Sequence, residues 1–187
     1  MPTTLKIFLC CLALLACGLD ASAQDSRAAD PCGDPARESS YWGILEGKVV
    51  KVLDGDTLTV SVEDKGLVRV RLNGIDAPEP GRPYGDGARR LLESLVGGQR
   101  VDVWVKPDQS WGRAPAEVTG VIHLPSVEHL DVNLLLVQSG LARHKKSAQY
   151  SMSNYAECHY VHAEKAARAA RRGLWRDEPR TAEATAK

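Results

Sequence analysis

The sequence predicts an α+β fold, in which about three helices pack around a small closed β-barrel of the OB type with five strands. Five short segments alternate apolar and polar residues with the period of half-buried strands. Segments with helical patterns follow the third and the fifth of them, and each ends at a glycine. Five short strands of this kind suit a small closed barrel with helices packed against it.

The first three predicted strands are close neighbours in the chain. Residues 49–53 form a short apolar run that leads into the corner Asp54-Gly-Asp56-Thr57. Residues 57–62 alternate hydroxyl and aliphatic side chains, and a Lys-Gly turn then leads into residues 68–72, where Val, Val and Leu alternate with two arginines. In this register Arg71 points away from the face that packs the apolar residues.

The rest of the domain mixes helices and strands. Residues 85–96 are predicted to form a helix, which follows a proline-rich segment and ends at a Gly-Gly pair. Two further strands are predicted at 100–105 and 116–124. A short helix at 132–139 and a long, alanine-rich helix at 154–172 complete the fold.

Both ends of the chain are expected to lie outside the folded domain. Residues 1–23 combine a lysine, an apolar stretch too short for a comfortable membrane span, and Ala-Ser-Ala at a cleavage position, the layout of a secretory signal. The sequence Leu-Leu-Ala-Cys17 also resembles a bacterial lipobox, although the second leucine is uncommon there, so lipid anchorage in the envelope through Cys17 is the alternative to a secreted or periplasmic protein. We expect a disordered arm at 24–41, the domain at 42–176 and a disordered tail at 177–187.

Cys32 and Cys158 remain after either form of processing, whereas Cys17 is either removed or lipidated. An even count in an oxidising compartment predicts one disulfide, which would tie the N-terminal arm to the last helix. Cys158-His-Tyr-Val-His162 also suggests zinc, because the two histidines lie one helical turn apart. We favour the disulfide, since no further ligand cluster is evident.

The charge of the chain argues against a pure nucleic-acid-binding module. Lys and Arg total 24 and Asp and Glu total 24, so the formal net charge is zero. A nonspecific duplex binder is usually basic, whereas an enzyme needs only local positive charge. The run Arg143-His-Lys-Lys146 could track a phosphate backbone or belong to a solvated surface. The same two interpretations apply to the cations of the last helix and its end, Lys165, Arg168, Arg171, Arg172 and Arg176.

Acidic and basic residues gather where predicted strands end. Asp56 and Asp76 lie at such ends, where their carboxylates can converge into a hard oxygen site that suits calcium. Glu79, three residues past Asp76, can reach a water as a general base or hold it by a hydrogen bond. Arg71 and Arg113 offer planar forks that match phosphate oxygens. The combination indicates phosphodiester chemistry.

Taken singly, each of these residues has a purely structural explanation. An Asp-Gly pair is common in hairpin turns. Asp76 could cap a loop, Glu79 could be a solvated loop acid, and isolated arginines are usually surface charges. Their joint occurrence favours a functional site.

Several motifs occur in a fixed order between about Gly47 and Trp175. They are Asp54–Thr57, Arg71–Glu79, Tyr84-Gly85, Gly112-Arg113, Asn133–Ala142 and Gly173–Trp175. Together they resemble the staphylococcal nuclease (thermonuclease) family. The resemblance implies an OB-fold barrel and calcium-dependent cleavage of DNA and RNA that leaves 3′-phosphate ends. It makes Asp56 and Asp76 the carboxylate ligands of calcium and the carbonyl of Ala77 the backbone ligand.

The chain departs from the family pattern in two places. Ala77 stands where the family's reference member has threonine, a change that leaves a carbonyl ligand in place. The loop Asp108–Trp111 carries no lysine close to Arg113, which puts affinity and base preference in doubt. Trp111 could stack on a base or pack within the loop.

The expected partners are DNA and RNA substrates, with single strands favoured, and the expected state is a monomer without a stable protein partner. The rival hypothesis is a non-catalytic OB-fold module that binds nucleic acid. Loss of any one of the two arginines, two aspartates or Glu79 would have favoured that module, and all five are present.

Overall fold

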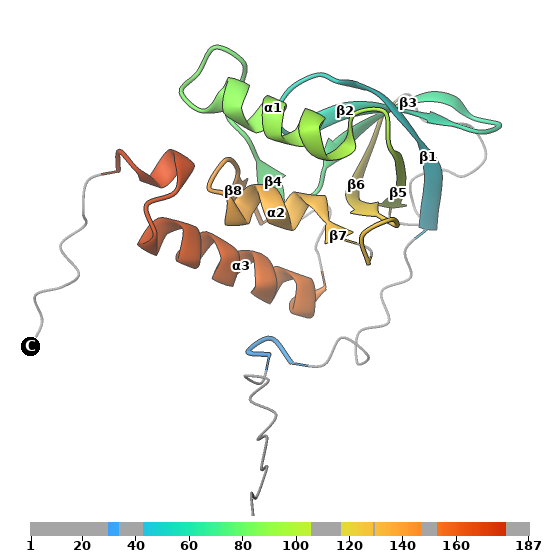
Figure 1. Ribbon diagram of the computed structural model, residues 1–187. Helices are drawn as coiled ribbons and strands as arrows, with labels where there is room; N and C mark the ends of the chain where they lie inside the picture. The colour runs from blue at the N-terminus through green and yellow to red at the C-terminus, as the bar shows by residue number, and fades with distance from the viewer. Residues whose placement is uncertain (1–29, 34–42, 106–116, 129, 147–152, 179–187) are drawn as a thin grey trace, which may run out of the picture. The chain divides into compact units, whose positions relative to one another are not determined.

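The computed structural model contains a closed β-barrel. β1 (Gly43–Val52), β2 (Thr57–Val62) and β3 (Gly66–Leu72) form an antiparallel meander. β1 also pairs with β5 (Arg100–Val105), and β5 pairs with β6 (Glu117–Leu124). Parallel pairing of β6 with β3 closes the barrel (Figure 1). The predicted five-stranded OB-type barrel is confirmed.

The chain divides into two units, Met1–Asp30 and Pro31–Lys187, and the fold described here belongs to the second. Within the described part, no helix has both the length and the apolar character needed to cross a membrane. The predicted secretory signal at 1–23 lies outside that part and stays a prediction. The structure describes residues 30–33, 43–105, 117–128, 130–146 and 153–178.

β1 begins at Gly43, earlier than the predicted start at Val49. Leu45, Gly47 and Val49 all face the barrel interior. A Cβ on Gly47 would collide with Val60 of the neighbouring strand, so this inward position carries no side chain. The gap interrupts the apolar alternation, which is why the first half of the strand was missed.

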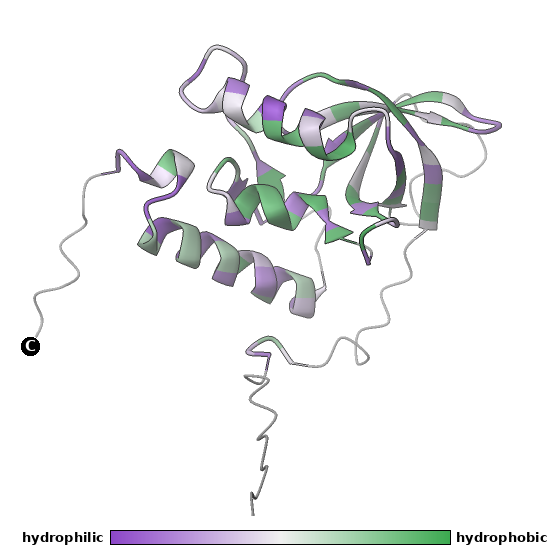
Figure 2. Ribbon diagram, viewed as in Figure 1, coloured by the Kyte–Doolittle hydropathy of each residue, from purple (hydrophilic) through white to green (hydrophobic). Residues whose placement is uncertain are grey.

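Helices close one side of the barrel. α1 (Gly85–Val96) and α2 (Val132–Gln138) lie next to each other, and α3 (Asn154–Ala169) packs against α2 (Figure 1). Figure 2 shows that α2 is largely hydrophobic, whereas α3 mixes hydrophobic and hydrophilic residues. The prediction extended the last helix to residue 172. It ends earlier because Arg171 adopts a left-handed φ of 51°, which reverses the chain before the 3-10 helix η2 (Gly173–Trp175).

Three two-residue strands were not predicted, because a periodic pattern cannot be seen in two residues. β7 (Leu130–Asp131) extends the sheet beside β6. β4 (Ile75–Asp76) pairs with β8 (Arg143–His144), which sets Asp76 opposite Arg143. The β4–β8 pair therefore brings a predicted metal ligand next to the basic run that follows α2.

Asn133 fixes α2 to the barrel near this pair. The side chain is fully buried. Its Oδ1 accepts a hydrogen bond from the backbone N–H of Ile122 at 3.1 Å. Its Nδ2 donates to the carbonyls of Asn73 at 3.0 Å and Gly120 at 3.2 Å. One buried amide thus links the helix, β6 and the turn between β3 and β4, and a buried amide with these partners is costly to replace.

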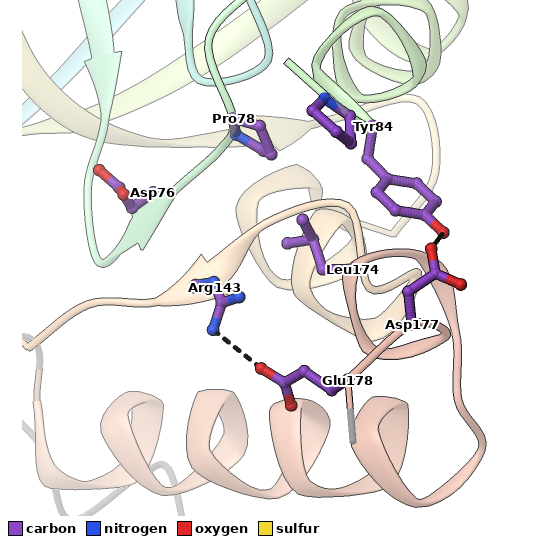
Figure 3. A pocket seen from close by; sticks show the side chains of 8 residues that line it. Asp76, Pro78, Tyr84, Arg143, Leu174, Asp177 and Glu178 are labelled. Atoms are coloured by element: carbon purple, nitrogen blue, oxygen red, sulfur yellow. Dashed lines mark hydrogen bonds and ion pairs between the residues drawn. The ribbon is translucent and has the colours of Figure 1, made fainter.

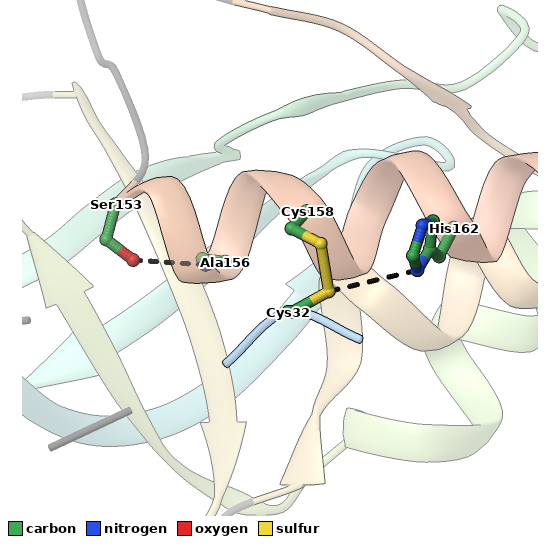
Figure 4. The surroundings of a disulfide bond; sticks show 5 residues. All are labelled: Cys32, Ser153, Ala156, Cys158 and His162. Atoms are coloured by element: carbon green, nitrogen blue, oxygen red, sulfur yellow. Dashed lines mark hydrogen bonds between the residues drawn. A yellow bond between two sulfur atoms is a disulfide. The ribbon is translucent and has the colours of Figure 1, made fainter. Parts of the chain in front are cut away.

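Cys32 and Cys158 form the predicted disulfide, with 5.5 Å between their Cα atoms and 126 residues between them in sequence. Figure 4 shows the bond on the side of α3, with His162 close to the Cys32 sulfur. The Sγ of Cys32 lies 3.9 Å from Nδ1 of His162. Because the two sulfurs are bonded to each other, neither is a thiolate that could bind zinc.

Candidate active site

Asp56 is the buried acid of the predicted site. It directly precedes β2 and is 4% exposed. Its Oδ1 accepts a hydrogen bond from Thr57 Oγ1 at 3.0 Å. Its Oδ2 accepts from the backbone N–H of Ala77 at 3.2 Å and from Arg71 Nη2 at 3.2 Å. The Asp56 N–H in turn donates to Asp54 Oδ1 at 2.9 Å, which fixes the corner before the strand.

Burial raises the pKa of the Asp56 carboxyl above its ordinary value of 3.8. The N–H of Ala77 and the guanidinium of Arg71 act in the opposite direction and favour the charged form. Burial is the larger of these opposing influences, and Arg71 is itself 42% exposed to solvent. A further cation at this position would stabilise the buried charge.

Arg71 brings the two predicted carboxylate ligands together. It is the penultimate residue of β3 and lies opposite Thr57 in the β2–β3 register. Its Nη2 is 3.2 Å from Asp56 Oδ2 and 3.5 Å from Asp76 Oδ1. A single nitrogen within reach of both acids shows that the buried Asp56 and the half-exposed Asp76 converge at one point.

Gly55 makes this convergence possible. A Cβ on Gly55 would lie 2.5 Å from the Cβ of Ala88 in α1 and 2.7 Å from the Cβ of Ala77. These separations are far below van der Waals contact, so a side chain here would push the corner away from Ala77. The hydrogen bond from the Ala77 N–H to Asp56 depends on that close approach.

Glu79 lies on an exposed loop whose backbone is fixed. Its carbonyl accepts a hydrogen bond from the N–H of Arg82 at 3.0 Å. A Cβ on Gly85 would collide with the same carbonyl, so the first residue of α1 packs directly against this turn. The Glu79 side chain itself is exposed. The loop is therefore anchored three residues past Asp76 while its acid faces solvent.

Lys145 belongs to the same cluster, and the sequence interpretation did not place it there. Its Nζ lies 3.3 Å from Asp76 Oδ1. The available signal was the basic run from Arg143 to Lys146. The β4–β8 register sets Arg143 opposite Asp76, yet the cation of this run that pairs with Asp76 is Lys145.

Several cations in and just after the last helix contact other parts of the fold. Arg168 stacks on Trp175, with its Cζ 3.8 Å from the ring centroid. Arg172 Nη1 donates to the carbonyl of Gln138 at 3.1 Å. Arg171 bonds to the backbone of Arg176. These contacts favour a structural role over backbone tracking for the three arginines.

A pocket of about 520 Å³ adjoins the cluster at Asp76. Figure 3 shows Asp76 at one end of the pocket and Tyr84 at the other. The Tyr84 hydroxyl donates to Asp177 at 2.8 Å, and Arg143 pairs with Glu178 at 3.5 Å. The pocket thus joins the acidic cluster to the segment that follows η2. Its other lining residues are Pro78, Pro83 and Leu174.

The donor set fits a hard divalent cation. Asp56 and Asp76 supply carboxylate oxygens, the ligands that such ions prefer. In the described part of the chain, no third acidic or histidine side chain joins these two to form a closed metal cage. Two carboxylates leave coordination positions for water and for a phosphate oxygen. Arg113 and Trp111 lie outside the described residues, so their predicted roles remain predictions.

Comparison with known proteins identifies the family. The family model described as staphylococcal nuclease homologue matches residues 69–177, more than half of the chain. The chain belongs to the staphylococcal nuclease family. The match begins in β3 and includes Arg71, Asp76, Ala77 and Glu79, so most of the converging residues lie within it.

Individual relatives of the staphylococcal nuclease family agree with this assignment. The micrococcal nuclease of Shigella flexneri is 36% identical over 142 residues, covering 73% of this chain and 76% of the relative. Protein ParB of Escherichia coli is 37% identical over 141 residues, covering 74% and 77%. An uncharacterized endonuclease of Escherichia coli is 34% identical over 140 residues, covering 73% and 83%. The relatives named as a micrococcal nuclease and an endonuclease support a nuclease, a hydrolase of phosphodiester bonds, and the family is generally metal-dependent.

Proposed function

We propose that the protein is an exported, calcium-dependent, sugar-nonspecific nuclease that cleaves DNA and RNA and leaves 3′-phosphate ends. One observation carries the proposal. A single nitrogen of Arg71 reaches both Asp56 and Asp76, so a phosphate-binding fork and two hard oxygen ligands share one point at the end of the barrel strands. This arrangement suits an anionic substrate that binds together with a divalent cation.

Asp56, Asp76 and the carbonyl of Ala77 would hold the calcium ion. When bound there, calcium would supply a Lewis acid that polarises the phosphate and orients a water. The buried Asp56 supports this assignment, because burial disfavours its charged form and a bound cation would favour it. The N–H of Ala77 at 3.2 Å from Asp56 places this residue's backbone beside the acid.

Three side chains accept the proton and stabilise the negative charge that develops during cleavage. Glu79 accepts the proton of the attacking water as its oxygen bonds to phosphorus. Arg71 binds the equatorial phosphate oxygens as negative charge builds up on them. The bond from phosphorus to the 5′-oxygen breaks while Arg113 donates a hydrogen bond to that departing oxygen, which then takes up a proton from solvent; Glu79 returns the proton that it accepted to solvent. The products are a 3′-phosphate and a 5′-hydroxyl.

Export rests on two features of the chain. Residues 1–23 have the layout of a secretory signal, with a lipid anchor at Cys17 as the alternative. The Cys32–Cys158 disulfide is compatible with an oxidising compartment. We propose that the mature protein acts as a monomer on DNA and RNA, with single strands favoured, and that Trp111 contacts a base.

The test is a cleavage assay on single-stranded DNA with calcium and then with a chelator. We expect wild-type cleavage to require calcium, because the bound ion would polarise the phosphate and orient the attacking water. Glu79→Gln and Arg113→Ala should each lower kcat by about 10²–10³-fold, the usual effect of removing one group that acts on the transition state. Mass spectrometry of the products should find 3′-phosphates.

Two results would contradict this function. Cleavage that continues in chelator would exclude the metal-dependent mechanism, and full activity of both variants would exclude the assigned roles. Tight binding of DNA by wild type without any cleavage would instead favour the non-catalytic OB-fold module.

A further inference from the structure

Lys145 is held beside the acidic cluster by its own backbone. Its N–H donates to the carbonyl of Gly74 at 2.9 Å, which continues the pairing between β4 and β8. The residue thereby lies next to the turn that leads from β3 into Asp76. Its Nζ reaches Asp76 Oδ1 at 3.3 Å, while the side chain remains 62% exposed. The contact therefore follows from the fold and leaves the ammonium open to solvent.

The neighbours of Lys145 point to the opposite side. His144 Nε2 lies 3.4 Å from Glu157 of α3, and Lys146 Nζ lies 3.6 Å from the same carboxylate. Side chains in an extended segment alternate between its two faces. Lys145 accordingly lies on the same face as Arg143, which is opposite Asp76 in the β4–β8 register, and its ammonium contacts Asp76. Lys146 carries the same charge toward α3.

Asp76 Oδ1 has two cationic partners in this structure. Arg71 Nη2 is 3.5 Å away and Lys145 Nζ is 3.3 Å away. Arg71 contacts Asp56 as well, and both of these acids are proposed calcium ligands. Among the described residues, Lys145 contacts Asp76 and no second acid. A divalent cation at Asp76 would therefore release the ammonium of Lys145.

We infer that Lys145 binds a phosphate of the substrate backbone beside the cleavage site, and that its ion pair with Asp76 opposes cation binding in the free enzyme. The inference rests on the proposed function. Lysine suits this role because its ammonium offers three donors on a flexible stem and needs no fixed fork geometry. The same side chain thus neutralises Asp76 before the cation binds and contacts substrate afterwards.

Calcium affinity tests whether the ion pair between Lys145 and Asp76 opposes cation binding. Calorimetric titration of wild type, Lys145→Ala and Lys146→Ala requires no catalysis. Lys145→Ala should bind calcium about three- to tenfold more tightly, since removing an exposed competing cation is a modest electrostatic gain. Lys146→Ala removes the same charge one residue away and should leave calcium affinity within about twofold of wild type.

Substrate affinity tests whether Lys145 binds a phosphate of the substrate backbone. Binding of a short single-stranded phosphorothioate DNA, which resists hydrolysis, can be followed by fluorescence anisotropy at saturating calcium. Lys145→Ala should weaken binding about five- to twentyfold. It should also make the negative slope of log K against log salt shallower by about 0.7, the value for one lost phosphate contact with a single strand. Lys145→Arg should restore most of the affinity and the slope. Lys146→Ala should change neither by a comparable amount.

The outcomes separate this inference from the proposed function. If wild type binds neither calcium nor the DNA, the proposed function fails. If wild type binds both but Lys145→Ala behaves like Lys146→Ala, only the role of Lys145 is overturned. Tighter calcium binding with an unchanged salt slope would likewise overturn it, because Lys145 would then oppose the cation without contacting phosphate.

Discussion

The proposed mechanism requires a guanidinium at Arg71. Its Nη2 reaches Asp56 and Asp76 together, which leaves other donors of the same planar group for a phosphate. A lysine ammonium would carry the charge without the fork. We therefore regard the geometry of Arg71, as well as its charge, as part of the mechanism.

Arg71→Lys tests this requirement. We expect kcat on single-stranded DNA to fall about 10²-fold or more, because the bidentate contact to the transition state is lost. Arg69→Lys is the matched control: Arg69 lies two residues earlier on β3 and pairs with exposed Glu117 at 3.5 Å. Steady-state kinetics should show a much lower kcat for Arg71→Lys than for Arg69→Lys. Equal activities of the two variants would contradict a bidentate contact of Arg71 with the phosphate.

Asp131 has a structural role in α2 that gives it an unusual titration. Its Oδ1 accepts the N–H of Leu134 at 2.9 Å and caps the helix. The hydroxyl of buried Tyr160 donates to both carboxylate oxygens, at 3.0 and 2.9 Å. Burial raises the pKa of Asp131 to about 6 from its ordinary 3.8, despite these hydrogen bonds. The folded protein therefore binds a proton that the unfolded chain releases between these two values.

This titration predicts how stability varies with pH. The contribution of Asp131 to the free energy of unfolding is fully present below pH 3.8. It is lost as the pH rises through about 6, because the folded state must then ionise a buried acid. Asp131→Asn keeps a good helix cap and should remove this pH dependence. The free energy of unfolding of Asp131→Asn minus that of wild type should therefore be higher at neutral pH than in acid, by on the order of 2 kcal/mol. Urea unfolding of both proteins across this range measures it. The exposed Glu63→Gln serves as control, and parallel curves for wild type and Asp131→Asn would contradict the assignment.

The long elements could be predicted from the sequence, whereas the short ones that complete the site could not. β2, α1 and β5 match their predicted bounds, because their patterns extend over six or more residues. The contact between Lys145 and Asp76 depends on β4 and β8, which are too short to have a pattern. The family resemblance predicted Asp56 and Asp76 as metal ligands, but no sequence pattern could show that Arg71 contacts both of them.

The disulfide connects distant parts of the described fold. It joins the Cys32 turn to α3 across 126 residues of sequence. Closing so long a loop restricts the unfolded chain and typically stabilises a protein by about 2–4 kcal/mol. The last helix also supports α2, whose Asn133 holds the turn before Asp76.

Replacing both cysteines by serine should therefore lower the free energy of unfolding by about 2–4 kcal/mol. Urea denaturation with and without reductant measures this loss. Wild type should lose a similar amount in reductant, and the double variant should not respond to reductant at all. An unchanged midpoint in the double variant would show that the bond contributes nothing to stability.

The central claim is that Asp56 and Asp76 hold the cation at which phosphodiester bonds are cleaved. The most direct measurement is the calcium dependence of single-stranded DNA cleavage by Asp76→Asn, with Asp64→Asn as control, because Asp64 is an exposed acid in the turn at the far end of β2. Loss of a direct ligand should cost at least as much as loss of an outer-shell partner, about 10–100-fold in metal affinity. We predict that Asp76→Asn needs at least about tenfold more calcium for its half-maximal rate while Asp64→Asn matches wild type; identical calcium curves for all three proteins would contradict the claim.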